Sequence, residues 1–444
     1  MIRTPTGMMA EEDARALLDQ CGFTPPPGTS TQDAFMMLLI EAQRQAQAER
    51  AAKRPGRGRT AELPATPAAA TAILQEFGAT AEPIQPCGYE IKGIDLAATD
   101  GVVPPNVAGA LELLMAERGF VLFRGQGRKL NESGVQGTYL SAEQQCKLSE
   151  CFSAGALHST HGVHPEAPCR DIFRLSNDPD HGFNEVGPEW HNDGSFCREV
   201  FGHVVYHIIK APEGAGDTRF AHLGIAYDQL SAKVQARLRR CASVNSNGGA
   251  VHPLAAPHPV SKRTSLYLHL GMTGTILEQL APDARSEEEE KEASAASAPT
   301  CDVRFGDGTT PPDLPAPKPG ADSGLSSVRA WREAEMDPFF CAFSDLLDSP
   351  GVCYSHKWRE GDVVVIDNLA VAHKAAPGAH KLASGLRILH RTTVLSARPH
   401  DPPPALKLPH TMPTDGPCPF EGAAWCEGYV GFRWGDFAAR AMPH

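Results

Sequence analysis

The sequence lacks long apolar runs and closely spaced cysteines. No stretch of the 444 residues approaches the roughly 20 apolar residues that a membrane-spanning helix needs. The 12 cysteines are scattered from Cys21 to Cys426, and no two have the CxxC spacing of zinc and redox motifs. We therefore expect neither a membrane span, nor a disulfide scaffold, nor a structural zinc site. Most of the cysteines are expected to be reduced, as is usual in the cytoplasm.

The chain also lacks an excess of basic residues. Its formal net charge is −12, whereas proteins that bind nucleic acid usually carry a basic surface. Near the start, Glu11, Glu12 and Asp13 precede any long apolar run, which is unlike a secretory signal. We expect a cytoplasmic protein with a small-molecule substrate and no nucleic-acid or membrane partner. Assembly into a homo-oligomer is left open.

Composition divides the chain into three parts. Residues 1–76 are expected to form an extension, with a helix at 31–54 followed by a linker rich in Ala, Pro and Thr. Residues 77–400 are expected to form the folded domain, interrupted by an acidic and then Pro/Gly-rich insertion at 284–325 that has few residues to bury. The tail at 401–444 is Pro-rich, but its aromatic residues predict that it packs on the body.

Short apolar segments bounded by Gly and Pro recur through the expected domain, and one helix is expected at 107–117. The expected strands are residues 89–97, 119–125, 171–176, 203–209, 264–270, 362–366 and 386–395. Many short strands separated by turns favour a mainly β barrel or jelly roll with flanking helices over a parallel βαβ sheet.

The segment EWHNDGSF, residues 189–196, is the clearest chemical motif. If this segment is a strand, His191 and Asp193 point to the same side and can bind one metal ion. A third ligand would complete the two-histidine, one-carboxylate set that holds iron(II) with open positions. His373, which follows the apolar strand DVVVI and a turn, is the candidate. Alone, a His-x-Asp pair is more often structural, so the case depends on its surroundings.

A possible anion site follows in the sequence. In LRILHRTTV, residues 386–394, Arg387 and Arg391 lie on one face of the expected strand. Two guanidinium groups inside a barrel are costly unless an anion pairs with them, and the planar group of arginine suits a carboxylate. Thr218, in GAGDTRF, can add a hydroxyl to the same carboxylate. Exposed arginines in ordinary surface salt bridges are the alternative.

Six motifs, taken in order, resemble the taurine dioxygenase family of iron(II)- and 2-oxoglutarate-dependent oxygenases. They are YEIKGIDLA, GFVLFRGQG, EWHNDGSF, KAPEGAGDTRFAH, HPLAAPHPVSKRTSLYL and the pair GDVVVIDNLAVAHKA with RILHRTTV, which together span about residues 80–400. The resemblance implies a double-stranded β-helix, a cupin-like jelly roll. The extension, the insertion and the tail after residue 400 have no counterpart in this family pattern.

The resemblance also implies the roles of individual residues. His191, Asp193 and His373 correspond to the iron ligands, while Thr218 and Arg387 correspond to residues that bind the far carboxylate of 2-oxoglutarate. Arg391 corresponds to an arginine that lines the active site. Because Asp193 is intact, hydroxylation is implied rather than halogenation. The implied reaction consumes O2 and 2-oxoglutarate and releases succinate and CO2.

The primary substrate is less constrained by the sequence. The resemblance places a sulfonate-binding histidine in LHSTHGVHP, residues 157–165, where His161 is the best match although the spacing differs by one residue. With Arg391 it predicts a small anionic substrate, with an organosulfonate such as taurine as the first choice and a small carboxylate as the alternative. A non-catalytic barrel that senses a metal or 2-oxoglutarate, and a zinc hydrolase with the same three ligands, are the competing hypotheses.

Overall fold

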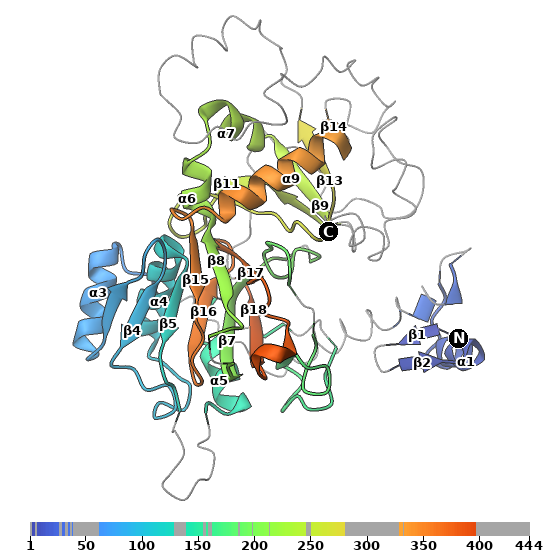
Figure 1. The fold of residues 1–444 in the computed structure, drawn as a ribbon, viewed down its shortest axis with the longest axis horizontal. Coiled ribbons are helices and arrows are strands. Elements are labelled where there is room, and N and C mark those ends of the chain that lie inside the picture. The colour runs from blue at the N-terminus through green and yellow to red at the C-terminus, as the bar shows by residue number, and fades with distance from the viewer. Residues whose placement is uncertain are drawn as a thin grey trace, which may run out of the picture.

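The fold is seen in a computed structural model (Figure 1). It describes residues 2–4, 7–25, 29–31, 34–35, 38, 62–127, 139–153, 157–158, 162–184, 187–197, 199–212, 214–245, 250–279, 328–331 and 333–396. Most of the expected helix at 31–54, the insertion at 284–325, the tail at 401–444 and His161 lie outside these residues, so those expectations stay predictions.

A seven-stranded sheet forms the centre of the body (Figure 1). Its order is β3-β4-β5-β16-β7-β18-β6, and every pair of neighbours is antiparallel except β4 and β5. The strands are β3 (Thr80–Pro83), β4 (Tyr89–Lys92), β5 (Phe120–Phe123), β6 (Phe173–Ser176), β7 (Phe201–Lys210), β16 (Val363–Asp367) and β18 (Ile388–Leu395).

A three-stranded sheet of order β15-β8-β17 packs against one face of the large sheet. It comprises β8 (Thr218–His222), β15 (Cys353–His356) and β17 (Val371–Ala375). Phe220 and Val371 of the small sheet share a buried cluster with Phe120, Tyr206 and Ile366 of the large sheet. The two sheets therefore enclose a common apolar core.

Helices cover the opposite face of the large sheet. They are α3 (Pro67–Glu76), α4 (Pro105–Arg118) and α5 (Ala142–Ser149). Along β5 the side chains alternate: Phe120 and Leu122 join the core between the sheets, whereas Val121 and Phe123 join the cluster beneath the helices. Since both faces are covered, all four residues are buried, and the strand reads as a continuous apolar run.

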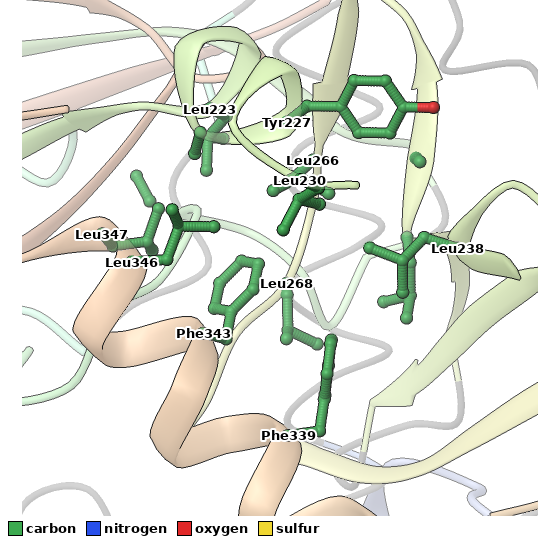
Figure 2. Packing of buried hydrophobic residues seen from close by; sticks show 14 of the residues in the cluster. Leu223, Tyr227, Leu230, Leu238, Leu266, Leu268, Phe339, Phe343, Leu346 and Leu347 are labelled. Atoms are coloured by element: carbon green, nitrogen blue, oxygen red, sulfur yellow. The ribbon is translucent and has the colours of Figure 1, made fainter. Parts of the chain in front are cut away.

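A third cluster covers the outer face of the small sheet. It is formed largely by α6 (Leu223–Asp228), α7 (Ala232–Leu238) and α9 (Glu333–Leu347), with Ala221 and Ala372 contributed by the small sheet. Figure 2 shows Phe339, Phe343 and Leu347 of α9 facing leucines of the neighbouring elements. The remaining strands here are β9 (Cys241–Asn245), β10 (Val251–Pro253), β11 (Ala255–Pro257), β12 (Thr264–Leu266), β13 (Thr273–Gln279) and β14 (Val328–Ala330).

The structure is mixed α/β with several sheets, and the sequence predicts too little helix. The helix expected at 107–117 is confirmed as α4, and each of the seven expected strands overlaps an observed strand, although the bounds differ. The helices α5, α6, α7 and α9 and the strands β8, β9, β13, β15 and β17 were not expected. In the extension, α1 (Glu11–Gln20) packs with a small cluster of its own, whereas α3 packs Ala70 and Leu74 against α4.

None of the helices in the described ranges is both long and apolar enough to cross a membrane.

Residues 280–327 connect two strand positions that are already adjacent, because Gln279 of β13 pairs directly with Val328 of β14. A two-residue Asn-Gly turn can join antiparallel neighbours, and a shorter loop adds no closure entropy. We predict that replacing 280–327 with Asn-Gly leaves the thermal midpoint within about 4 °C of the parent. A Gly/Ser segment of the original length is the control. Loss of folded protein with Asn-Gly, but not with the long control, would contradict the prediction.

Candidate active site

His191 and His373 are joined by their backbones. The amide of each donates to the carbonyl of the other, at 3.1 Å from His191 N to His373 O and 3.0 Å in the reverse direction. His373 lies in the middle of β17, where it pairs with Phe220 of β8, so the small sheet fixes its position. The imidazole rings lie 4.1 Å apart, measured between centroids.

Asp193 reaches the same place by a different route from the one expected. The prediction that His191 and Asp193 lie on one strand is wrong, because residue 191 makes only an isolated bridge and a turn begins at residue 193. The side chain of Asn368 holds this turn: its Oδ1 accepts from the amide of Asp193 at 2.9 Å, and its Nδ2 donates to the carbonyl of Asp193 at 2.9 Å. Gly194 follows with φ +75°, where a Cβ would lie 2.7 Å from the ring of Phe201.

The three side chains form a buried cluster. One ligand atom from each of His191, Asp193 and His373 lies within 4.8 Å of the others. The Nε2 atoms of His191 and His373 lie 3.9 and 3.7 Å from the two carboxylate oxygens of Asp193. Burial lowers the pKa of both histidines, that of His373 to about 3, so each imidazole is neutral. Burial opposes ionisation of Asp193, but the charge of Arg391 and the hydrogen bond from Tyr206 hold its pKa below the ordinary value.

This donor set fits a divalent transition metal. Neutral imidazole and carboxylate are the forms that bind metals. Nδ1 of His191 lies 2.6 Å from the carbonyl oxygen of Glu189, to which it donates, and this leaves Nε2 with its lone pair toward Asp193. Gly187 permits the arrangement, because a Cβ there would lie 2.9 Å from Cε1 of His191. Three protein ligands leave coordination positions for other molecules.

Tyr206 and Arg391 complete the wall around the carboxylate. The hydroxyl of Tyr206 donates to Asp193 Oδ2 at 3.1 Å and lies 2.8 Å from Nε2 of His373. Nη1 of Arg391 donates to Asp193 Oδ1 at 2.7 Å, while its guanidinium lies over the ring of Phe173 at 4.5 Å. Arg391 was predicted to line the active site, and the structure places it against Asp193.

Arg387 lies in a second buried group of side chains. Its Nη2 donates to Thr218 Oγ1 at 3.3 Å, and Trp358 Nε1 donates to the same oxygen at 2.9 Å. Burial lowers the pKa of Arg387 to about 10, so the group stays cationic at neutral pH. Arg387 makes no ion pair with any carboxylate of the described residues, and its Nε has no hydrogen-bond partner among them. A buried cation in this state is a site for an anion.

The two groups of side chains are adjacent through Tyr206. Tyr206 contacts Asp193 and His373. Burial raises the pKa of Tyr206, and the nearby charge of Arg387 opposes this rise. Leu389, between the two arginines in the sequence, is buried in the core between the sheets. Arg387 thus lies just before β18 and is buried, whereas Arg391 lies on β18 and is half-buried. That the two belong to one site stays a prediction.

Asp348, just after α9, binds the residues next to three members of the site. Its carboxylate accepts from Arg219 at 2.6 Å, Lys374 at 2.7 Å and Trp190 at 3.3 Å. These donors are the chain neighbours of Thr218, His373 and His191. Because side chains alternate along β8 and β17, the donors lie on the outer face while Thr218 and His373 face inward. Asp348 thus links β8, β17 and the segment before His191 on the outer face of the small sheet.

His269 is a second histidine in the site that the sequence did not single out. It follows β12, and its ring lies 4.9 Å from that of His191 between centroids. Burial and the neighbouring His191 lower the pKa of His269 well below its ordinary value, and its Nδ1 has no partner among the described residues. Trp358 and Tyr206 were missed as well. No local motif marks these three residues, because the tertiary fold brings them to the site from separate segments.

The comparisons with known proteins agree on one family. The model of the "Taurine catabolism dioxygenase TauD, TfdA family" matches residues 80–393. An α-ketoglutarate-dependent sulfonate dioxygenase of Saccharomyces cerevisiae is 26% identical over 223 residues, which are 45% of this chain and 51% of the yeast protein. The chain thus spans about half the length of that relative.

Two further relatives are matched over more of their length. An α-ketoglutarate-dependent 2,4-dichlorophenoxyacetate dioxygenase of a Burkholderia species is 23% identical over 319 residues, which are 69% of this chain and 91% of that protein. The crystal structure of a taurine dioxygenase from Burkholderia xenovorans matches 72% of this chain and 89% of its own, with 19% identity and a TM-score of 0.48. Because the family model covers most of the chain, including every residue of the two groups of side chains, the chain belongs to the TauD/TfdA family of dioxygenases.

Proposed function

We propose that this chain is an iron(II)- and 2-oxoglutarate-dependent dioxygenase that hydroxylates a small anionic molecule. The observation that carries the proposal is the buried Arg387, which has no carboxylate partner among the described residues, beside the cluster of His191, Asp193 and His373. A metal site alone would suit many reactions. A metal site with a buried cation next to it suits a co-substrate that has a carboxylate at each end, as 2-oxoglutarate has. We also propose that the two facing sheets form the double-stranded β-helix of the family.

The residues would divide the work as follows. His191, Asp193 and His373 would hold the metal, and Glu189 and Asn368 orient two of these ligands through hydrogen bonds. Bound iron would supply oxidative decarboxylation of 2-oxoglutarate to succinate and CO2, coupled to hydroxylation of a C–H bond. Arg387 and the hydroxyl of Thr218 would bind the far carboxylate and so fix the keto acid in one orientation, while Trp358 holds Thr218 in place through its N–H.

The primary substrate would lie near Arg391 and His269. Nε of Arg391 has no partner among the described residues, and Arg391 offers donors beyond the one engaged by Asp193. Sulfonates and carboxylates both present paired oxygens to such a group. The yeast relative is named for sulfonates and the Burkholderia relative for a phenoxyacetate, and both substrates are anions. We propose an organosulfonate such as taurine first and a small carboxylate second.

Replacing any of the three ligands should abolish metal binding. We predict that His191→Ala, Asp193→Ala and His373→Ala each weaken iron(II) binding by more than about 100-fold, because even supporting residues of a metal site contribute 10- to 100-fold. Anaerobic calorimetry measures the affinity, and circular dichroism checks that the variant is folded. His181→Ala, which removes an exposed histidine bound to Glu166, is the control. Normal iron affinity in one variant would remove that residue from the proposed site.

Removing the buried Arg387 side chain should weaken binding of 2-oxoglutarate more than binding of the primary substrate. We predict that Arg387→Ala raises the KM for 2-oxoglutarate roughly 10- to 150-fold, since a hydrogen bond to a charged group contributes about 1.5–3 kcal/mol. Trp358→Phe should give a smaller rise, because it removes a neutral donor. Arg263→Ala, which breaks the surface pair with Asp228, is the matched control. An unchanged KM would place the carboxylate elsewhere.

Succinate release tests both the reaction and the substrate class. We predict that the iron-loaded protein releases succinate faster with taurine, other alkylsulfonates or small carboxylic acids than with their neutral analogues. His269→Ala should raise the KM for the accepted acid more than that for 2-oxoglutarate. A protein that binds iron and 2-oxoglutarate but yields no succinate with any compound would be a sensor. Hydrolysis supported by zinc without 2-oxoglutarate would indicate the hydrolase instead, and stimulation only by neutral or cationic compounds would exclude an anionic substrate.

A further inference from the structure

Two cysteines from separate segments meet at the edge of the large sheet. Cys146 lies on α5, and Cys169 lies in the loop that leads to β6. Their sulfur atoms and a carboxylate oxygen of Asp171 lie within 4.8 Å of one another. Cys146 is buried, whereas Cys169 is partly exposed. One thiol is therefore accessible to a small solute, and the other lies behind it.

The surroundings of Cys169 favour its thiolate. The thiol of Cys146 and the backbone amides of Asp171 and Ile172 lie around the sulfur of Cys169 and favour its charged form. Burial and the charge of Asp171 raise the pKa of Cys169, but the three donors outweigh them and lower it to about 6. The contact with Cys169, together with burial, raises the pKa of Cys146. The pair thus has a nucleophile on the outside and a protonated partner within.

A metal ion is the competing occupant of this cluster. Structural zinc sites have four protein ligands from Cys, His, Asp or Glu. Among the described residues the cluster offers three such side chains. The contact between the two sulfurs instead matches a thiol and thiolate pair, in which one sulfur attacks an oxidant and the other resolves the product.

We propose that Cys169 is a peroxide-reactive site and that Cys146 resolves it to a disulfide. The thiolate of Cys169 attacks hydrogen peroxide, an S–O bond forms, the O–O bond breaks, and hydroxide leaves to give a sulfenic acid. Cys146 then attacks the sulfur of Cys169, an S–S bond forms, the S–O bond breaks, and the departing hydroxide takes the proton of Cys146. Two thiols lose two electrons, and one peroxide is reduced to two waters.

The disulfide would link two segments that both support β18. Gln145, the neighbour of Cys146, donates through Nε2 to the carbonyl of His390 and to Thr392 Oγ1, each at 3.3 Å. Downstream of Cys169, Phe173 begins β6, pairs with Arg391 on β18 and lies under its guanidinium. The site is therefore coupled by packing to the strand that carries Arg391, although its chemistry does not depend on the proposed dioxygenase reaction.

The test is peroxide treatment of the full-length chain without added iron, followed by alkylation of free thiols and peptide mapping without reduction. We expect a linked Cys146–Cys169 peptide that disappears on reduction. Cys169→Ser should abolish it, and Cys146→Ala should leave a sulfenic acid at Cys169 that dimedone traps. Cys341→Ser, which removes an exposed cysteine on α9, is the control and should leave the linked peptide unchanged.

Alkylation at different pH values gives an independent measure. In the parent protein the alkylation rate of Cys169 should reach half of its maximum at a pH below the pKa of an ordinary thiol, and Cys146→Ala should shift this midpoint upward. Three outcomes would overturn the proposal. They are peroxide oxidation of Cys21 and Cys341 without the linked peptide, a midpoint that Cys146→Ala leaves unchanged, and stoichiometric zinc in the purified protein that Cys169→Ser releases.

Discussion

The backbone bridge between His191 and His373 is the constraint on which the site depends. Two hydrogen bonds, at 3.1 and 3.0 Å, hold together residues that are far apart in the sequence, and each imidazole is placed by the backbone rather than by its own rotamer alone. Burial lowers the pKa of both histidines and so keeps their imidazoles neutral. Because neutral rings do not repel each other as two cations would, the two imidazoles can lie side by side. Asp193 then needs only a turn, held by Asn368, to bring its carboxylate to both Nε2 atoms.

Asp348 illustrates how the outer layer supports this bridge. Successive side chains of a strand point to opposite faces of the sheet. Arg219 and Lys374 therefore point outward from β8 and β17, next to Thr218 and His373, which point into the site. One carboxylate that binds both cations, and Trp190 beside them, fixes the two strands and the segment before His191 against the end of α9. The cluster of apolar residues around α9 therefore positions the site as well as contributing to stability.

The sequence predicted the chemistry of this site better than its geometry. Local patterns singled out His191, Asp193, His373, Arg387 and Arg391, because each lies in or just after a short motif whose residue types suit metal or anion binding, whereas Thr218 was singled out by the resemblance to the family. The strand assumed for His191 and Asp193 was wrong, since periodicity cannot distinguish a strand from an isolated bridge that leads into a turn. Tyr206, Trp358, His269 and Asp348 could not be identified, because the tertiary fold brings them to the site from separate segments.

The buried charges of the two groups of side chains point to an order of binding. Arg391 is already neutralised by Asp193, whereas Arg387 has no carboxylate partner among the described residues. If 2-oxoglutarate binds at Arg387 as proposed, its far carboxylate offsets the free energy of burying Arg387, and it gains more there than an acid bound at Arg391 does. Arg391 must exchange or share its contact with Asp193 before it binds a second anion. This asymmetry favours 2-oxoglutarate as the first ligand and the primary substrate as the second.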